Sequence, residues 1–360
     1  MKERRNEFDL IRAVSTLAIV LFHYSYAFVQ YDVGGDPIYF MMHANGTWGA
    51  LFVSLFFMLS GSSLYYNWND RMTSFTGKGG ILDFYKKRFL SIFPMFYIGW
   101  VICYIMTVIS FNGLKNWGGP YSKLFLTLFG VDGYFLYRGL NYYLIGEWFL
   151  GAIIMLYVLY PLLQWCMKKI PVIATVIIVL LFALNISRQY LPFMSGYNAW
   201  IQISDNINII TCLLSFWTGI LLGKTGRSII KSFTAIPCLV LGLVIMIFPM
   251  PVSTMILSPL LAVCFYICLS FLSVILDKKL KKRKAYDKTV GFVSRYSYPI
   301  FLVHHVTIQK MITLFSGREM NFAASIGYFF VTLAAILLIA FILSKLTDLI
   351  LKLPKTLRSA

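Results

Sequence analysis

The sequence is poor in charge, and acidic residues are its scarcest charged kind. Charged residues make up 13% of the 360 and hydrophobic residues 59%, with 14 Asp and Glu against 32 Lys and Arg. A soluble globular domain carries about 25% charged residues, so this composition excludes that class for most of the chain. The sequence also lacks an internal repeat and a low-complexity linker, and its longest polar-containing stretch, about 111–141, is itself apolar and aromatic. We expect a single transmembrane domain over residues 1–360 and no soluble domain.

Paired cysteines and a signal-peptide cleavage site are lacking too. The six cysteines lie in or at the ends of apolar runs without Cys-x-x-Cys spacing, which predicts buried free thiols and excludes a disulfide framework or a metal site. Asp9 and Arg12 interrupt the start of the first apolar run, and no small-residue cleavage site ends it. We therefore expect this run to be retained as a first helix.

Long apolar runs are what the sequence does contain. Backbone inside lipid must satisfy its own hydrogen bonds, and uninterrupted runs of roughly 20 residues favour helices over a barrel. The sequence predicts an all-α integral membrane protein, a bundle of about ten transmembrane helices. The predicted spans are residues 8–29, 47–67, 90–110, 142–166, 171–188, 206–223, 233–250, 253–276, 290–310 and 323–351.

The basic residues alternate between the loops and so predict an orientation. With the N-terminus inside, 24 Lys and Arg fall on the inner side and six on the outer side, as the positive-inside rule requires. We predict a multi-pass protein of the cytoplasmic membrane with both termini cytoplasmic. The net charge of +18 is then explained by orientation and by contact with anionic lipid of the bilayer, and no nucleic-acid partner is expected.

Two ionisable residues lie in the first predicted span, where charge is costly and each is a functional candidate. Arg12 and His23 are eleven residues apart, which on a helix places them on one face with a rise of about 16 Å. Arg12 either neutralises a phosphate or pairs with Asp9 and lipid. His23 is the best candidate for a general base, because imidazole exchanges a proton near neutral pH. A hydrogen-bonded packing role is the alternative.

The fourth and ninth spans hold further ionisable candidates. Arg295 and His304 are nine residues apart, hence on opposite faces of a helix, and are not expected to act as a pair. His304 or His305 either lines a cavity or hydrogen-bonds between helices. Glu147 either contacts a polar acceptor or sits in the interface.

Small and aromatic residues give weaker indications. Ser60 belongs to the run 59–62, whose small residues permit close helix approach or local unwinding beside a ligand. The exterior aromatics form an interfacial belt or stack on sugar rings. They are Trp48, Trp117, Tyr121, Tyr134, Tyr137, Tyr142, Tyr143, Tyr190, Tyr197 and Trp200.

Five short motifs follow one another across about 300 residues. They are the stretch 8–13 followed by His23, the stretch 56–61, the stretch 87–90 with Pro94, Trp148-Phe149-Leu150 with Tyr157 and 161–163, and Ser297-Tyr298 with His304. In this order they resemble the membrane acyltransferase-3 family, which O-acylates cell-surface carbohydrates. The family implies roughly ten helices. Many members carry glutamate shortly after the fourth-span tryptophan, where this chain has Ile153 and Ile154.

The resemblance implies a membrane O-acyltransferase, expected to be an O-acetyltransferase. It would move an acyl group from cytoplasmic acyl-CoA, expected to be acetyl-CoA, to a hydroxyl of a surface or secreted polysaccharide or its lipid-linked precursor. Acyl-CoA is a donor substrate, and no tightly bound cofactor or metal is expected. Together, the chemistry of the residues and the resemblance give these candidates: His23, Arg12 and Asp9 for catalysis, Arg12, Lys86, Lys87, Arg88 and Ser60 for the donor, and Glu147, Trp148, Tyr157, His304 and Arg295 for the acceptor or cavity lining.

Several alternatives stay open at the level of sequence. His23 either deprotonates the acceptor or passes the acyl group outward. No SGNH-type extracytoplasmic domain follows the last helix, so the chain completes transfer alone or needs a glycan synthase or a separate extracytoplasmic transferase as partner. A polysaccharide exporter or secondary transporter is the main rival. A structural subunit of a glycan synthase complex is the second.

Overall fold

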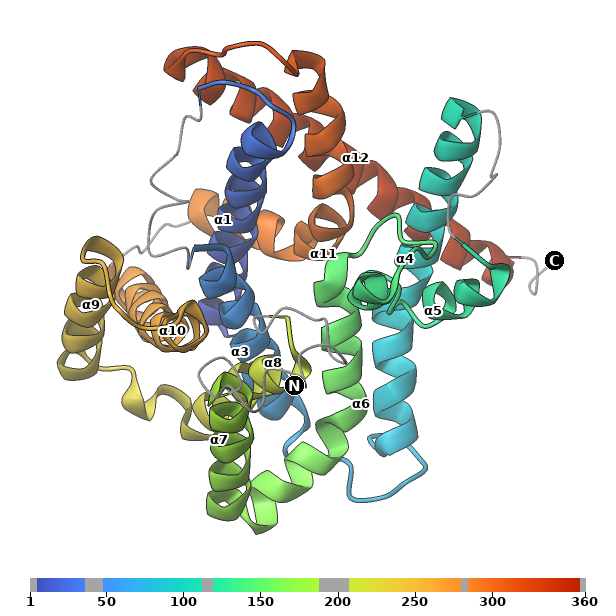
Figure 1. The fold of residues 1–360 in the computed structure, drawn as a ribbon. Coiled ribbons are helices and arrows are strands. Elements are labelled where there is room, and N and C mark those ends of the chain that lie inside the picture. The colour runs from blue at the N-terminus through green and yellow to red at the C-terminus, as the bar shows by residue number, and fades with distance from the viewer. Residues whose placement is uncertain (1–4, 36–47, 112–118, 188–206, 280–283, 357–360) are drawn as a thin grey trace. The chain divides into compact units, whose positions relative to one another are not determined.

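The computed structural model describes residues 5–35, 48–111, 119–187, 207–279 and 284–356. These residues are mostly helical and contain no β-strand, only an isolated bridge between Gly34 and Glu319. The helices of Figure 1 are α1 (Asn6–Gln30), α3 (Trp48–Trp68), α4 (Ile81–Phe111), α5 (Leu124–Leu128), α6 (Glu147–Lys169), α7 (Pro171–Ser187), α8 (Ile209–Thr225), α9 (Ser232–Ile247), α10 (Thr254–Lys279), α11 (Lys284–Ile312) and α12 (Phe322–Thr356). Short 3-10 helices are η1 (Tyr121–Lys123), η2 (Tyr134–Arg138), η4 (Gly226–Ile229) and η5 (Thr313–Phe315).

Each predicted span coincides with one long helix of the described part. Seven of them, α1, α3, α4, α6, α8, α10 and α12, are long and apolar enough to cross a membrane. Helices α7 and α9 are apolar but shorter, with 17 and 16 residues, and α11 is long but more polar. The all-α, multi-pass membrane class is thus supported, while the count of ten and the orientation of the termini stay predictions.

Some helices begin at other residues than the predicted spans, because hydropathy does not detect a helical turn made of polar residues. Helix α4 begins at Ile81 instead of residue 90, and α11 at Lys284 instead of residue 290, because their first turns are charged. Helix α6 begins at Glu147 instead of residue 142, since Gly146 and Glu147 have φ angles of 99° and 45° and break the helical path.

Some predicted features lie outside the described residues. They are residues 47, 188 and 206 at the span ends, the aromatic residues Trp117, Tyr190, Tyr197 and Trp200, and the basic residues Lys2, Arg4, Lys115, Arg188, Lys281, Lys282, Arg283 and Arg358. All six cysteines are described and free, but only Cys212 and Cys264 are buried. The prediction that all six are buried is wrong for the other four, which lie partly exposed on helix surfaces.

The described residues divide into two compact units. The first unit takes its residues from 1–19, 40–84 and 152–294, and the second from 20–39, 85–151 and 295–360. Each unit has its own hydrophobic core. The first half of α1 therefore belongs to one core and the second half to the other.

In the first unit, α3 and α8 approach each other through glycines. A Cβ on Gly61 would lie 2.1 Å from the carbonyl oxygen of Phe216, and one on Gly219 would lie 2.0 Å from that of Met58. Nearby, the hydroxyls of Ser62 and Tyr266 share a buried hydrogen bond of 2.6 Å. The run 59–62 thus serves close helix packing, one of the two roles expected from its small residues.

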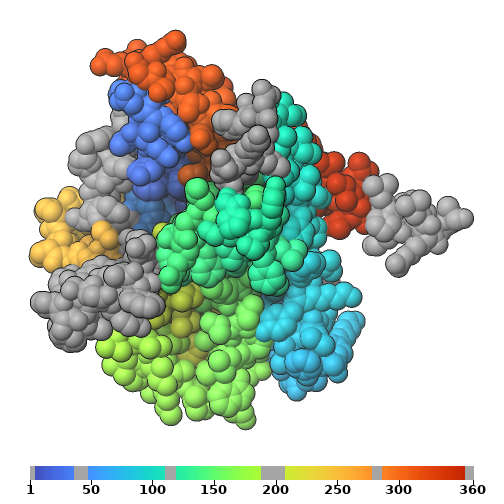
Figure 2. Space-filling view, turned by 45° about the vertical axis from the view of Figure 1, so that its right-hand side comes forward, coloured from blue at the N-terminus to red at the C-terminus, as the bar shows by residue number. Residues whose placement is uncertain are grey.

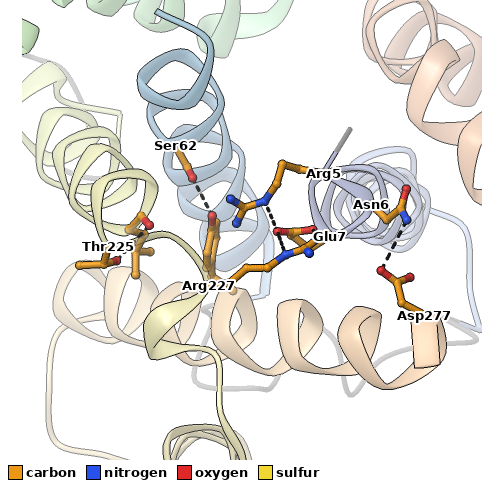
Figure 3. A network of polar contacts seen from close by, with 9 residues as sticks. Arg5, Asn6, Glu7, Ser62, Thr225, Arg227 and Asp277 are labelled. Atoms are coloured by element: carbon orange, nitrogen blue, oxygen red, sulfur yellow. Dashed lines mark hydrogen bonds and ion pairs between the residues drawn. The ribbon is translucent and has the colours of Figure 1, made fainter. Parts of the chain in front are cut away.

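A polar network fastens the start of α1 within the same unit (Figure 3). The carboxylate of Glu7 is 1% exposed and binds the guanidinium groups of Arg5 and Arg227, the latter through two hydrogen bonds of 3.1 and 2.9 Å. The amide of Asn6 lies 3.5 Å from Asp277 of α10. Two basic residues that the positive-inside rule assigns to the inner side therefore neutralise a buried carboxylate.

In the second unit, two tyrosine hydroxyls join helices that are distant in sequence. Tyr24 of α1 donates to the carbonyl of Ser325 in α12 at 2.8 Å, and Tyr298 of α11 donates to that of Ile92 in α4 at 2.9 Å. Apolar side chains of α1, α11 and α12 fill the core around Tyr24. These contacts hold the helices that carry His23 and its neighbours.

Candidate functional site

Three histidines meet in the second unit. His23 of α1 lies with its Nδ1 3.1 Å from Nε2 of His305 in α11. The ring centroid of His23 lies 4.6 Å from that of His305 and 5.0 Å from that of His304. The packing of α1 against α11 thus places His23 in a cluster that can exchange protons.

The second nitrogen of His305 faces a carboxylate. Its Nδ1 lies 3.0 Å from Oε1 of Glu147, the first residue of α6, and the phenol of Tyr143 donates to the same oxygen at 2.9 Å. The side chain of Glu147 is 15% exposed and that of His305 37%. A carboxylate, two imidazoles and a phenol therefore form one continuous polar chain.

The segment 119–146 contacts Glu147 through Tyr143 and Gly133. Figure 2 shows the segment as a teal and green patch on the face in view. Asp132 is buried and accepts hydrogen bonds from Thr127 and from the backbone N–H of Gly133, each at 3.0 Å. Asn141 donates to the carbonyl of Asp132 and accepts from the N–H of Tyr143. Burial raises the pKa of the Asp132 carboxyl above its ordinary value of 3.8, while the hydrogen bond from Thr127 opposes the rise.

Close backbone packing sets the position of Glu147 itself. A Cβ on Gly133 would lie 2.7 Å from the carbonyl oxygen of Glu147, so only glycine fits there. Glu147 has a φ of 45°, a left-handed conformation that is unusual for a residue with a side chain. Such strain is often retained where a side chain must point in one direction for function.

His304 is held differently from His305. It is 1% exposed, and its Nδ1 lies 2.8 Å from the carbonyl oxygen of Phe301 one turn earlier. A carbonyl only accepts, so Nδ1 carries the proton and Nε2 carries the lone pair. Within the described part of the chain, that Nε2 has no hydrogen-bond partner.

Arg12 lies in a separate cluster in the first unit. Its Nη1 donates to the hydroxyl of Ser294 at 3.1 Å, and this hydroxyl donates to Oδ1 of Asp9 at 2.6 Å. Nη1 also lies 3.6 Å from the same oxygen of Asp9. The expected pairing of Arg12 with Asp9 is present, and Ser294 bridges the two.

The other expected donor residues fall in different parts of the structure. Ser60 is partly buried in α3 of the first unit. The side chains of Lys86 and Lys87 are exposed and that of Arg88 is partly buried, all on α4 in the second unit. A common donor site formed by Arg12 and this basic stretch stays a prediction.

The expected acceptor residues divide in the same way. Glu147, Trp148 and His304 belong to the second unit, whereas Tyr157 belongs to the first. The ring of Trp148 lies 6.4 Å from that of Phe149, and Phe149 packs at 5.3 Å against Phe301, next to the histidines. Arg295 is exposed, and none of the contacts described for the histidine cluster involves it.

The aromatic belt expected at the exterior is partly replaced by packing. Tyr134 and Tyr142 are buried, and the hydroxyl of Tyr142 donates to the carbonyl of Gly119 at 3.0 Å, whereas Tyr121 is exposed. Tyr143 binds Glu147, a contact that neither the belt nor sugar stacking predicts.

Sequence reasoning missed the partners of its best candidates. It named His305 only as an alternative to His304, and it treated Tyr143 as an exterior aromatic residue. Ser294 was not expected to bind Arg12. The spacing of four residues between Tyr143 and Glu147 signals a contact only within a helix, and α6 begins at Glu147, so periodicity could not have found this pair.

Among the described residues, no group of three or more His, Cys, Asp or Glu side chains has a geometry that could hold a metal ion.

Comparison with known proteins gives a single result. The acyltransferase domain family matches residues 5–345, which is nearly the whole chain and includes both clusters. Neither the curated proteins nor the solved structures contain a match. A match of this extent identifies the chain as a member of the acyltransferase-3 family.

Proposed function

We propose that this membrane acyltransferase moves an acyl group from acyl-CoA to a hydroxyl of a surface or secreted polysaccharide or its lipid-linked precursor. Acetyl-CoA is the proposed donor and O-acetylation the proposed modification. The observation that carries the proposal is the contact of His23 with a second histidine inside an acyltransferase domain. A histidine so placed suits a proton transfer in acyl exchange.

His23 acts as the general base in this proposal. It removes the proton of the acceptor hydroxyl while the oxygen attacks the thioester carbonyl, so that a carbon–oxygen bond forms. The carbon–sulfur bond then breaks, and the proton held by His23 passes to the departing sulfur. One ester and one free thiol result, and no net proton is gained or lost.

Arg12 is proposed to bind the donor on the same helix. It lies eleven residues before His23 in the continuous helix α1, which separates the two by about 16 Å along the axis. Arg12 is expected near the cytoplasmic boundary, where CoA phosphates are available, and an arginine fork suits phosphate oxygens. Lys86, Lys87 and Arg88 are proposed to add positive charge for the same phosphates.

The replacement His23→Ala tests the proposal. We expect the variant to insert normally and to lose acetyl transfer by about 10²–10⁴-fold, the usual contribution of a general base. The measurement is the transfer of radiolabelled acetyl from acetyl-CoA to isolated surface polysaccharide by the purified full-length protein in lipid vesicles. Unchanged transfer by the variant would refute the role of His23.

Mass analysis of the cell-surface glycan, with and without the gene product, tests the acceptor and the acyl group together. The proposal expects an added acyl mass only when the protein is present. Restoration of the mass by purified protein alone would show that no glycan synthase or separate transferase is required. Glycan export without any added acyl mass would instead support the hypothesis of a polysaccharide exporter or secondary transporter.

A further inference from the structure

We propose that His305 and Glu147 form a proton relay with His23, in which they orient its imidazole and share the positive charge that it acquires. The relay runs from Glu147 Oε1 to His305 Nδ1 over 3.0 Å and from His305 Nε2 to His23 Nδ1 over 3.1 Å. This inference rests on the proposed role of His23 as the base. His305 and Glu147 are positioning residues in it, because they act through His23.

The carboxylate determines where the protons lie. An ionised carboxylate only accepts hydrogen bonds, so His305 directs a proton on Nδ1 toward Glu147. In a neutral His305, Nε2 then carries the lone pair and accepts from Nδ1 of His23. The remaining nitrogen of His23, Nε2, is left with a lone pair. Glu147 thereby selects, through two rings, the tautomer of His23 that can act as a base.

The same geometry provides a place for the proton that His23 removes. When His23 Nε2 takes the hydroxyl proton, the proton on its Nδ1 passes to His305 Nε2 along the hydrogen bond whose nitrogen atoms are 3.1 Å apart. His305 then bears the positive charge beside the carboxylate of Glu147, and His23 is neutral again. The reverse shift returns a proton from His305 Nε2 to His23 Nδ1, and the proton on His23 Nε2 is delivered to the thiolate of CoA. Each atom recovers its starting protonation state at the end of one turnover.

Three features hold the carboxylate of Glu147 in position. It is the first residue of α6, where free backbone N–H groups and the helix dipole favour a negative charge. Tyr143 donates a hydrogen bond of 2.9 Å to the oxygen that also faces His305. Gly133 packs against its carbonyl so closely that a Cβ would lie 2.7 Å away.

Within the described part, the titratable groups that face the pair are few. They are Glu147 of α6, Tyr143 of the segment before it, and His304 beside His305 on α11. The Nδ1–H of His304 donates to the backbone carbonyl of Phe301, so His304 does not take part in this relay. Glu147 is therefore the acid whose removal should change the pH dependence of the reaction.

The experiment compares three single variants, Glu147→Gln, His305→Ala and His23→Ala. It also includes the double variant that combines Glu147→Gln with His23→Ala. The readout is acetyl transfer from acetyl-CoA to isolated surface polysaccharide by full-length protein in lipid vesicles, between about pH 5 and 9. Asp348→Asn makes the same carboxylate-to-amide change at an exposed position of α12 and serves as the control. Unfolding temperatures in detergent identify variants that fail to fold.

We expect Glu147→Gln and His305→Ala to lower kcat by about 10–100-fold with little change in KM for acetyl-CoA, a smaller loss than that of His23→Ala. The acidic limb of the kcat profile of Glu147→Gln should move to lower pH, because an amide stabilises a protonated relay less than a carboxylate does. The double variant should be no slower than His23→Ala alone, since residues that act as a unit are not additive.

The relay is refuted if His23→Ala is inactive while Glu147→Gln and His305→Ala, both folded, keep the kcat and the pH profile of the wild type. It is also refuted if the double loss is the product of the single losses, because Glu147 would then act independently of His23. Full activity of His23→Ala is a different outcome, which overturns the proposed base itself.

Discussion

The guanidinium group of Arg12 makes its described contacts through one nitrogen, Nη1, which faces Ser294 and Asp9. The remaining N–H groups are what a phosphate would bind. We expect Arg12→Gln to raise the KM for acetyl-CoA by about 10–100-fold, the value of one or two charge-assisted hydrogen bonds, and to leave the KM for polysaccharide unchanged. Arg318→Gln, at an exposed arginine, is the control. An equal rise in both KM values would show that Arg12 only maintains the fold.

Individual residues were predictable where their chemistry alone marks them. Arg12 and His23 are costly in an apolar run, and helix periodicity places them on one face without knowledge of any neighbour. The contact of His23 with His305 was not predictable, because it depends on which helices pack together and in what rotation. Glu147 was recognisable as an ionisable residue, but its direction depends on a φ of 45° that no periodicity encodes.

Helices α3 and α8 depend on glycine for their separation, and this gives a prediction at the scale of elements. In Gly219→Ala the new Cβ would meet the backbone oxygen of Met58 at 2.0 Å, so the helices must move apart. We expect the free energy of unfolding to fall by about 1–3 kcal/mol, as at other overpacked sites. The unfolding temperature in detergent should fall with it. In Gly327→Ala on α12, the Cβ meets no atom of the described residues within 4 Å, so stability should hold or rise. Equal shifts in the two variants would contradict this packing argument.

Helix existence followed from hydropathy, whereas helix ends did not. The apolar runs predicted a helix at each place where the structure has a long one. The first turns of α4 and α11 are charged and were not predicted. Hydropathy measures how favourably residues transfer into lipid, and it does not report whether the backbone is helical. Residues 142–146 were expected to begin a helix, and the aromatic residues before them to form an interfacial belt or stack on sugars. Instead, hydrogen bonds around Asp132 organise the segment 119–146 next to Glu147.

The orientation of the whole molecule rests on its basic residues and can be tested directly. Arg71 and Arg138 are both exposed, and the positive-inside rule assigns Arg71 to the inner side and Arg138 to the outer side. In a cysteine-free background, we expect a membrane-impermeant maleimide to label Arg138→Cys in intact cells and Arg71→Cys only after permeabilisation. Labelling of Arg71→Cys in intact cells would overturn the proposed topology, and with it a cytoplasmic donor near Arg12.

The order in which the ribosome makes this chain has a consequence for how α1 acquires its partners. Asn6, Asp9, His23 and Tyr24 bind Asp277, Ser294, His305 and Ser325, which follow them by 271, 285, 282 and 301 residues. Helix α1 therefore waits until α10, α11 and α12 have been made before these side chains find their partners. Nascent chains that stop before α11 would hold Arg12 and His23 in lipid without these contacts, and would be preferred substrates for membrane quality control.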